Sequence, residues 1–153
     1  MDDYKSYKDY YNALDSLITL EINKFKQLSS KQKARAVFTH FNRYWNAVFG
    51  EGKVARSMNA DLREGLMDRW NFQASKELSL LTDEEMTLYL QVVLAELHKF
   101  ISKGNNENMV KVTFFTTLIG RIPEKLNQEC EAIKDEIVKL YDEHFKDERA
   151  MNQ

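Results

Sequence analysis

The chain has few residues that interrupt a helix. Its 153 residues contain one proline and five glycines, the two residue types that most often mark turns. A β-sandwich or β-barrel of this length would need many short strands joined by turns rich in these residues. A length of 153 residues is also usual for one domain with a substantial core. We therefore predict an all-α fold, a single-domain bundle of five or six helices over residues 1–153.

Features of membrane and secreted proteins are also lacking. No apolar run approaches the ~20 residues that cross a bilayer, and the start, MDDYKSYKDYY, has no basic region followed by an apolar run. The lone Cys130 cannot form an internal disulfide, which fits a reducing compartment. We expect a cytoplasmic protein with no membrane partner.

The usual signatures of metal, nucleotide and catalytic sites are missing as well. His40, His98 and His144 are far apart and on different predicted helices, and none has the glutamate three residues before it that di-iron bundles use. One cysteine cannot build a thiolate zinc site. GEGK (50–53) lacks both the first glycine and the Ser/Thr of a phosphate loop. We predict no metal, no cofactor and no catalytic residue.

Hydrophobic periodicity and capping signals place the helices. The segment 110–119 is rich in β-branched residues, but a single strand in a helical chain would leave its backbone groups unpaired, so we predict a helix there. The other predicted helices cover 4–28, the stretch from the Ser29/Gln32 capping box to Gly50, 59–80, the stretch from the Thr82/Glu85 capping box to Gly104, and Pro123 to about Arg149.

The stretch FTHFNRYWNAVFGEGKVAR (38–56) combines aromatic and basic residues around a glycine turn. At 100° per residue, nearly all apolar residues of its helix share one arc, whereas His40 and Arg43 lie outside it. A surface that stacks nucleic-acid bases needs aromatic and basic side chains on one exposed face. We therefore predict that the aromatic residues, Trp45 among them, belong to the core.

Positive charge is concentrated in residues 22–56, which hold eight Lys/Arg and one acidic residue. Such a segment is a candidate for binding an anion or an acidic partner. On the second helix the cations surround the polar side and form no single line, which favours pairing with acidic helices over a nucleic-acid track. The candidate residues are Lys31, Lys33, Arg35, Arg43, Lys53 and Arg56.

Two polar residues interrupt apolar faces and are candidates for buried polar groups. Glu21 lies within the apolar arc of the first helix, where a carboxylate must be paired, protonated or open to a cleft. A structural contact with a tyrosine hydroxyl or a basic side chain is the simpler interpretation, and a ligand-binding or proton-handling role is the alternative. His144 is in line with the apolar positions of the last helix, which predicts a core or interface histidine.

Surplus apolar faces point to protein partners. Leu88, Val92 and Ala95 form a second stripe on the fourth predicted helix, and the last helix repeats apolar positions at 4–3–4–3–4 spacing from Leu126 to His144. The favoured hypothesis is a non-enzymatic interaction or regulatory protein that binds another macromolecule, as a homodimer. The two alternatives are a nucleic-acid-associated protein using residues 22–56, and a small-ligand binding protein or enzyme with Glu21 in a bundle cavity.

Overall fold

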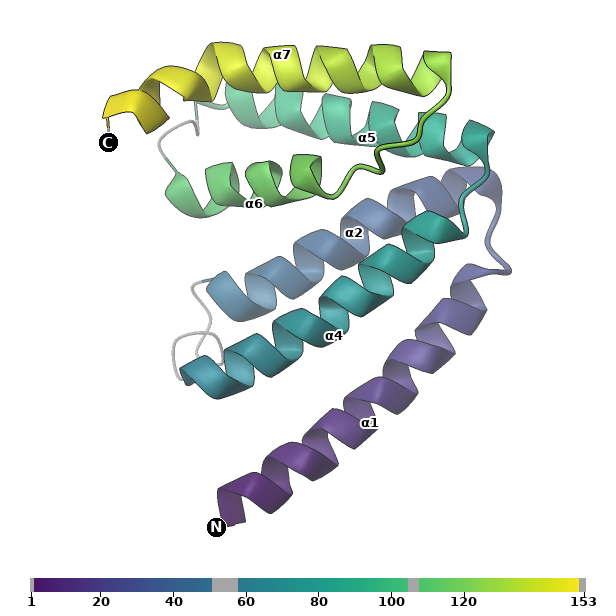
Figure 1. The fold of residues 1–153 in the computed structure, drawn as a ribbon, viewed down its shortest axis with the longest axis vertical. Helices are drawn as coiled ribbons and strands as arrows, with labels where there is room; N and C mark the ends of the chain where they lie inside the picture. The colour runs from purple at the N-terminus through teal and green to yellow at the C-terminus, as the bar shows by residue number, and fades with distance from the viewer. Residues whose placement is uncertain (1, 51–57, 105–107, 152–153) are drawn as a thin grey trace. The chain divides into compact units, whose positions relative to one another are not determined.

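The protein is built from helices, as the sequence predicts. A computed structural model describes residues 2–50, 58–104 and 108–151, and the side chains of 8–50, 58–104 and 108–145. These residues contain no strand, and their helices include no apolar stretch of the length needed to span a bilayer. The helices are α1 (Asp2–Phe25), α2 (Ser30–Phe49), α4 (Ala60–Ser79), α5 (Asp83–Ser102), α6 (Met109–Gly120) and α7 (Gln128–Met151) (Figure 1).

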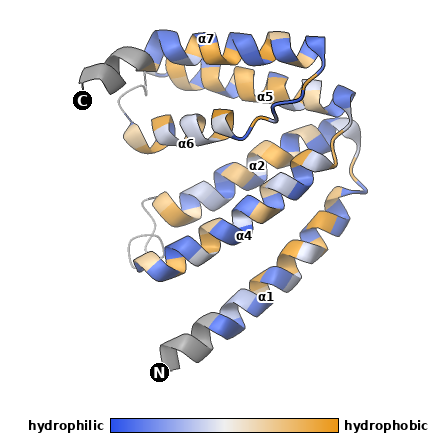
Figure 2. Cartoon of the chain, in the orientation of Figure 1, coloured by the Kyte–Doolittle hydropathy of each residue, from blue (hydrophilic) through white to orange (hydrophobic). Residues whose placement is uncertain are grey.

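Contacts divide the chain into two compact units, Met1–Leu81 and Thr82–Gln153. In the first unit, α1 and α2 both pack against α4; in the second, α5 packs along α7, which also contacts α6. Apolar and polar residues alternate along the helices in both units (Figure 2), the pattern of amphipathic helices. That residues 1–153 form a single domain stays a prediction.

Both predicted capping boxes are present. The Ser29 hydroxyl accepts a hydrogen bond from the Gln32 amide (3.3 Å), while the Gln32 side chain accepts one from the Ser29 amide (3.1 Å). The same exchange joins Thr82 and Glu85 at the start of α5. Each box satisfies backbone donors that a helix start leaves unpaired, and so fixes where α2 and α5 begin.

The segment predicted as a helix in spite of its β-branched residues is helix α6. Its buried side chains include Phe114 and Phe115, whose rings lie 5.2 Å apart, and Phe115 also packs on Phe100 of α5 at 5.5 Å. The Thr113 hydroxyl donates to the Met109 carbonyl one turn back (2.8 Å). Burial of the aromatic side chains therefore outweighs the strand propensity of this segment.

Helix α1 approaches α4 closely at Gly65. A Cβ atom at this position would lie 2.5 Å from Cζ of Tyr11, so a side chain there would displace the tyrosine ring. The Arg69 guanidinium lies over the same ring, 4.0 Å from its centroid. Ile18 and Phe25 complete the buried side of α1. Gly65 thus gives Tyr11 the space to pack on α4.

The predicted start of the last helix is wrong. Residues 123–127 are not helical, and α7 begins at Gln128, five residues after Pro123. The Asn127 side chain accepts a hydrogen bond from the Cys130 amide (2.8 Å), as an N-cap residue does. Proline is favoured at the first helical position but does not require a helix to start there, and asparagine is among the best N-caps.

The core position predicted for His144 is wrong, since this residue is exposed in the described chain, whereas an interface role for it stays a prediction. Among the side chains of α7 that the structure describes, the buried ones are Cys130, Ile137, Tyr141 and Phe145, with the Tyr141 and Phe145 rings 5.1 Å apart. A straight helix turns about 20° per heptad away from a strict seven-residue repeat. Toward the C-terminus of α7, the buried residues are therefore those at 141 and 145, one position after the predicted 140 and 144.

Candidate functional site

A group of polar side chains that hydrogen-bond one another lies inside the first unit, where three helices meet. We call it the polar cluster. Its members come from α1, α2 and α4, and every one of them hydrogen-bonds another: Glu21, His40, Arg43, Tyr44, Gln73 and Glu77.

Glu21 is the acceptor that joins all three helices. The Tyr44 hydroxyl lies 2.6 Å from its Oε2, and Nε2 of Gln73 donates to the same atom at 2.8 Å. Nη2 of Arg43 donates to both carboxylate oxygens, at 3.1 and 3.3 Å. The Glu21 side chain is 22% exposed. The structure thus gives Glu21 both of the structural contacts that the sequence suggested, a tyrosine hydroxyl and a basic side chain.

Glu77 lies deeper than Glu21 and is 1% exposed. Its Oε2 is 2.7 Å from Nδ1 of His40, which is partly exposed, and 3.2 Å from Nε2 of the fully buried Gln73. Its other oxygen, Oε1, has no hydrogen-bond partner among the described residues. Burying a carboxylate with one of its two oxygens unpaired lowers the stability of the folded state. His40 supplies its positive partner when the imidazole is protonated.

Tyr44 connects the two halves of the cluster. Its oxygen lies within hydrogen-bond distance of Glu21 Oε2 and, at 2.5 Å, of Gln73 Oε1, yet one hydroxyl proton serves only one acceptor at a time. Burial and the hydrogen bond to Glu21 raise the pKa of Tyr44, so the phenol keeps that proton. Tyr44 also accepts a hydrogen bond from Arg43 at 3.1 Å.

The charges of Glu21 and Arg43 support each other. Burial acts to raise the pKa of Glu21, but hydrogen bonds from Tyr44 and Gln73, and the positive charges of Arg43 and His40, outweigh it and hold the pKa below its usual value. Burial acts to lower the pKa of Arg43, while contacts with Tyr44 and Glu21 leave it raised. Both residues are therefore charged at neutral pH, and the cluster joins α1, α2 and α4 by charge-assisted hydrogen bonds.

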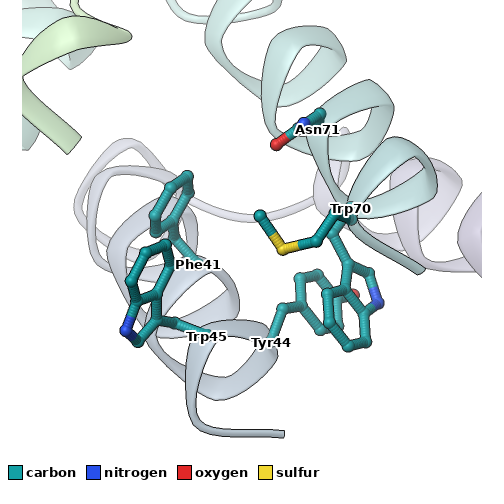
Figure 3. Close-up of a pocket in the computed structure, with 6 residues that line it drawn as sticks. Phe41, Tyr44, Trp45, Trp70 and Asn71 are labelled. Atoms are coloured by element: carbon teal, nitrogen blue, oxygen red, sulfur yellow. The ribbon is translucent and has the colours of Figure 1, made fainter. Parts of the chain in front are cut away.

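A small aromatic groove adjoins the cluster between α2 and α4 (Figure 3). The Tyr44 and Trp70 rings stack at 4.9 Å with their planes 2° apart, and Phe41 stacks on Trp45 at 6.5 Å. The cavity measures about 20 Å³, room for about one water molecule, whereas small-molecule sites measure ~300–1,000 Å³. Its lining consists of Phe41, Tyr44, Trp45, Met67, Trp70 and Asn71.

Trp45 is 6% exposed, so the predicted inward aromatic face of α2 is confirmed. His40 was placed outside that face from the sequence, yet it is half-buried against Glu77. Phe72, by contrast, is 54% exposed on α4. Of the aromatic residues of α2, Phe38 and Trp45 thus belong to the buried core of the first unit, and Tyr44 and Phe49 pack against that core.

The candidate basic residues that the structure describes differ in exposure and contacts. Arg43 is bound to Glu21, Lys31 and Arg35 are exposed, and Lys33 is half-buried. Lys53 and Arg56 lie outside the described residues. The Arg43–Glu21 pair is the kind of contact between basic and acidic helices that we favoured over a phosphate track.

The candidate interface residues of α5 are only partly covered. Leu88 and Val92 are half-buried and Ala95 is exposed. Leu88 also lines a depression of about 340 Å³ at the N-terminal ends of α5 and α7, together with acidic residues that include Asp83 and Glu129. No group of His, Cys, Asp or Glu among the described residues is arranged to hold a metal ion.

A second apolar face runs along α1, beside the side that packs on α4. Tyr10, Leu17 and Leu20 are each 50% exposed, and Ala13 is exposed as well. The spacing of these residues is 3–4–3, which places them within about 80° of one another on the helix. We call these four residues the α1 stripe. It is apolar, continuous and accessible in the described chain.

Sequence reasoning missed Gln73, Glu77 and the α1 stripe. Leu66, Trp70, Gln73 and Glu77 follow 4–3–4 spacing, so the polar pair continues the buried face of α4. The spacing of apolar residues alone continues that face through Ala74 and Leu78 instead. The stripe was missed because Ala13 and Leu20 lie beside the main apolar arc of α1, which includes Tyr10 and Leu17.

No protein-family model matches the chain, and no curated protein and no solved structure is significantly similar to it. The arguments about function therefore rest on the residues described above.

Proposed function

We propose that the protein is a non-enzymatic helical interaction protein that acts as a homodimer and associates through the α1 stripe. The observation that carries this proposal is the continuous exposure of Tyr10, Ala13, Leu17 and Leu20 on one side of α1. Large apolar side chains at helical spacing on an exposed face are typical of protein–protein contacts. Removing them from water on association is favourable by roughly 25 cal/mol for each Å² buried.

The polar features of the first unit favour internal roles. The polar cluster uses its groups to bind one another, and the aromatic groove has room for about one water molecule. Arg43, one of the candidate cations of α2, is already engaged by Glu21. These contacts support a structural role for the cluster, so the proposal rests on the exposed α1 stripe.

The proposal is tested by the oligomeric state of two charge variants on α1. A seam of four apolar positions is short, so we expect a dissociation constant in the micromolar range, accessible to sedimentation velocity at about 1–200 µM protein. Leu17→Glu places a charge in the middle of the stripe and should make the protein monomeric. Asn12→Glu places the same charge on an exposed position of α1 outside the stripe and should leave the dimer intact.

Circular dichroism of both variants checks that the helices are retained. A wild-type protein that sediments as a monomer at every concentration would overturn the proposal. So would a dimer that Leu17→Glu leaves unchanged, since its interface would then lie elsewhere.

A further inference from the structure

We propose that two copies of the chain pair their α1 helices in antiparallel orientation, with Tyr10 against the partner's Leu20 and Ala13 against the partner's Leu17. This inference rests on the proposed function and names the geometry of the same surface. Three features of the described residues carry it: the register of the stripe, the sizes of its side chains and the charges at its two ends.

The register is that of a coiled-coil seam. Spacing of 3–4–3 assigns Tyr10 and Leu17 to position a of a heptad and Ala13 and Leu20 to position d. In a parallel pair of identical helices, each residue faces its own equivalent. When one helix is reversed, position a of one copy faces position d of the other. A two-fold dimer allows either arrangement, since both present the same patch from each copy.

Side-chain volume favours the antiparallel arrangement. In a parallel pair, Ala13 would face the partner's Ala13 and leave a gap next to a layer of two leucines. In the antiparallel pair, the small Ala13 faces the large Leu17 twice, and Tyr10 faces Leu20 at both ends. The two inner layers then each pair a small residue with a large one, and no layer joins two alanines, which favours dense packing.

Charge favours the same orientation. Lys24 occupies the next position a after Leu17 and is exposed, and Asp9 flanks the stripe beside Tyr10 and is also exposed. A parallel pair would place Lys24 against the partner's Lys24. In the antiparallel pair, Lys24 comes within one helical turn of the partner's Asp9, at both ends of the seam. Lys8, the other charge near Tyr10, lies about 160° around the helix from it and outside the seam.

Disulfide trapping tests the orientation. In a Cys130→Ser background, which removes the native thiol, Ala13→Cys and Leu17→Cys proteins are oxidised separately and as a mixture. A disulfide needs the two Cα atoms within about 7 Å. We expect a cross-linked dimer in the mixture, between one copy of each variant, and little from either variant alone. Efficient cross-linking of Ala13→Cys on its own would overturn the antiparallel pairing.

A charge exchange provides an independent readout of the same orientation. Lys24→Glu should weaken the dimer by roughly threefold or more, because two facing charge pairs become repulsive. Adding Asp9→Lys to that variant should restore the affinity in an antiparallel dimer. If the double change gives no recovery, the antiparallel pairing is wrong. A dimer that is lost with Leu17→Glu but cross-links through Ala13 alone would leave the proposed function standing and refute only the orientation.

Discussion

At the scale of single residues, Glu21 shows how its surroundings determine what a carboxylate does. It lies within the apolar arc of α1, yet it accepts hydrogen bonds from Tyr44, Gln73 and Arg43. These donors, with the nearby His40, hold the pKa of Glu21 below its usual value although burial acts in the opposite direction. The folded state therefore favours the charged form of this side chain.

We predict an acid-dependent loss of stability that traces to Glu21. Because the pKa is lower in the folded protein than the ~4.3 of an unfolded chain, the stabilisation is fully present above that value and is lost as the pH falls through the lower, folded value. Glu21→Gln should therefore flatten the decrease in unfolding free energy between about pH 6 and pH 3. Urea unfolding followed by tryptophan fluorescence measures this change.

Glu64→Gln is the matched control, since Glu64 is an exposed carboxylate of α4 outside the polar cluster. It should keep the wild-type pH dependence. Equal slopes for Glu21→Gln and the wild type would show that the Glu21 contacts do not stabilise the folded state.

The sequence reveals that Glu21 needs a partner but not which one. The position of Glu21 within an apolar arc indicates that its carboxylate needs a polar partner, and the sequence suggests the types of partner, a tyrosine hydroxyl or a basic side chain. Gln73 and Glu77 were missed because a polar pair at core spacing on α4 resembles an exposed edge of the helix. Their burial depends on how α2 and α4 pack, which periodicity within one helix does not determine.

At the scale of helices, start signals with two reciprocal hydrogen bonds were predicted best. The capping boxes of α2 and α5 form as expected, because each is a local contact within four residues. The start of α7 was misplaced, because a proline allows a helix start without requiring one. A core position for His144 was wrong because the buried face of α7 drifts, and that drift depends on Tyr141 and Phe145 packing in the second unit.

We predict that Asn127, and not Pro123, determines where α7 begins. Asn127→Ala removes the side-chain acceptor of the Cys130 amide and should lower the unfolding free energy by about 1 kcal/mol, the usual cost of losing an N-cap. Pro123→Ala lies outside the helix and should cost less. Urea unfolding followed by far-UV circular dichroism compares the two variants. A larger loss for Pro123→Ala than for Asn127→Ala would refute this assignment.

At the scale of the whole molecule, each of the two compact units has its own buried residues. Met58, Leu66 and Trp70 belong to the first, and Leu97 and Phe145 to the second. The all-α class followed from composition and periodicity alone. The division into two units did not, since it depends on contacts between residues distant in sequence.

A comparison of two spectroscopic probes tests the prediction of a single domain. Both tryptophans, Trp45 and Trp70, lie in the first unit, whereas helices of both units contribute to far-UV circular dichroism. If residues 1–153 unfold as one domain, the two probes should give the same urea midpoint, and this is the result that we expect. Two midpoints, with fluorescence reporting only one of them, would show that the units unfold separately.

The single cysteine gives the second unit a probe of its own. Cys130 is 1% exposed, and its sulfur lies 3.2 Å from the Thr87 hydroxyl, so α5 covers the thiol in the folded state. A thiol reagent can reach the sulfur only when α5 and α7 separate. The rate of alkylation, divided by that of an unfolded chain, would therefore give the free energy of that opening. Tryptophan emission and thiol labelling together would record the local stability of both halves of the unaltered chain.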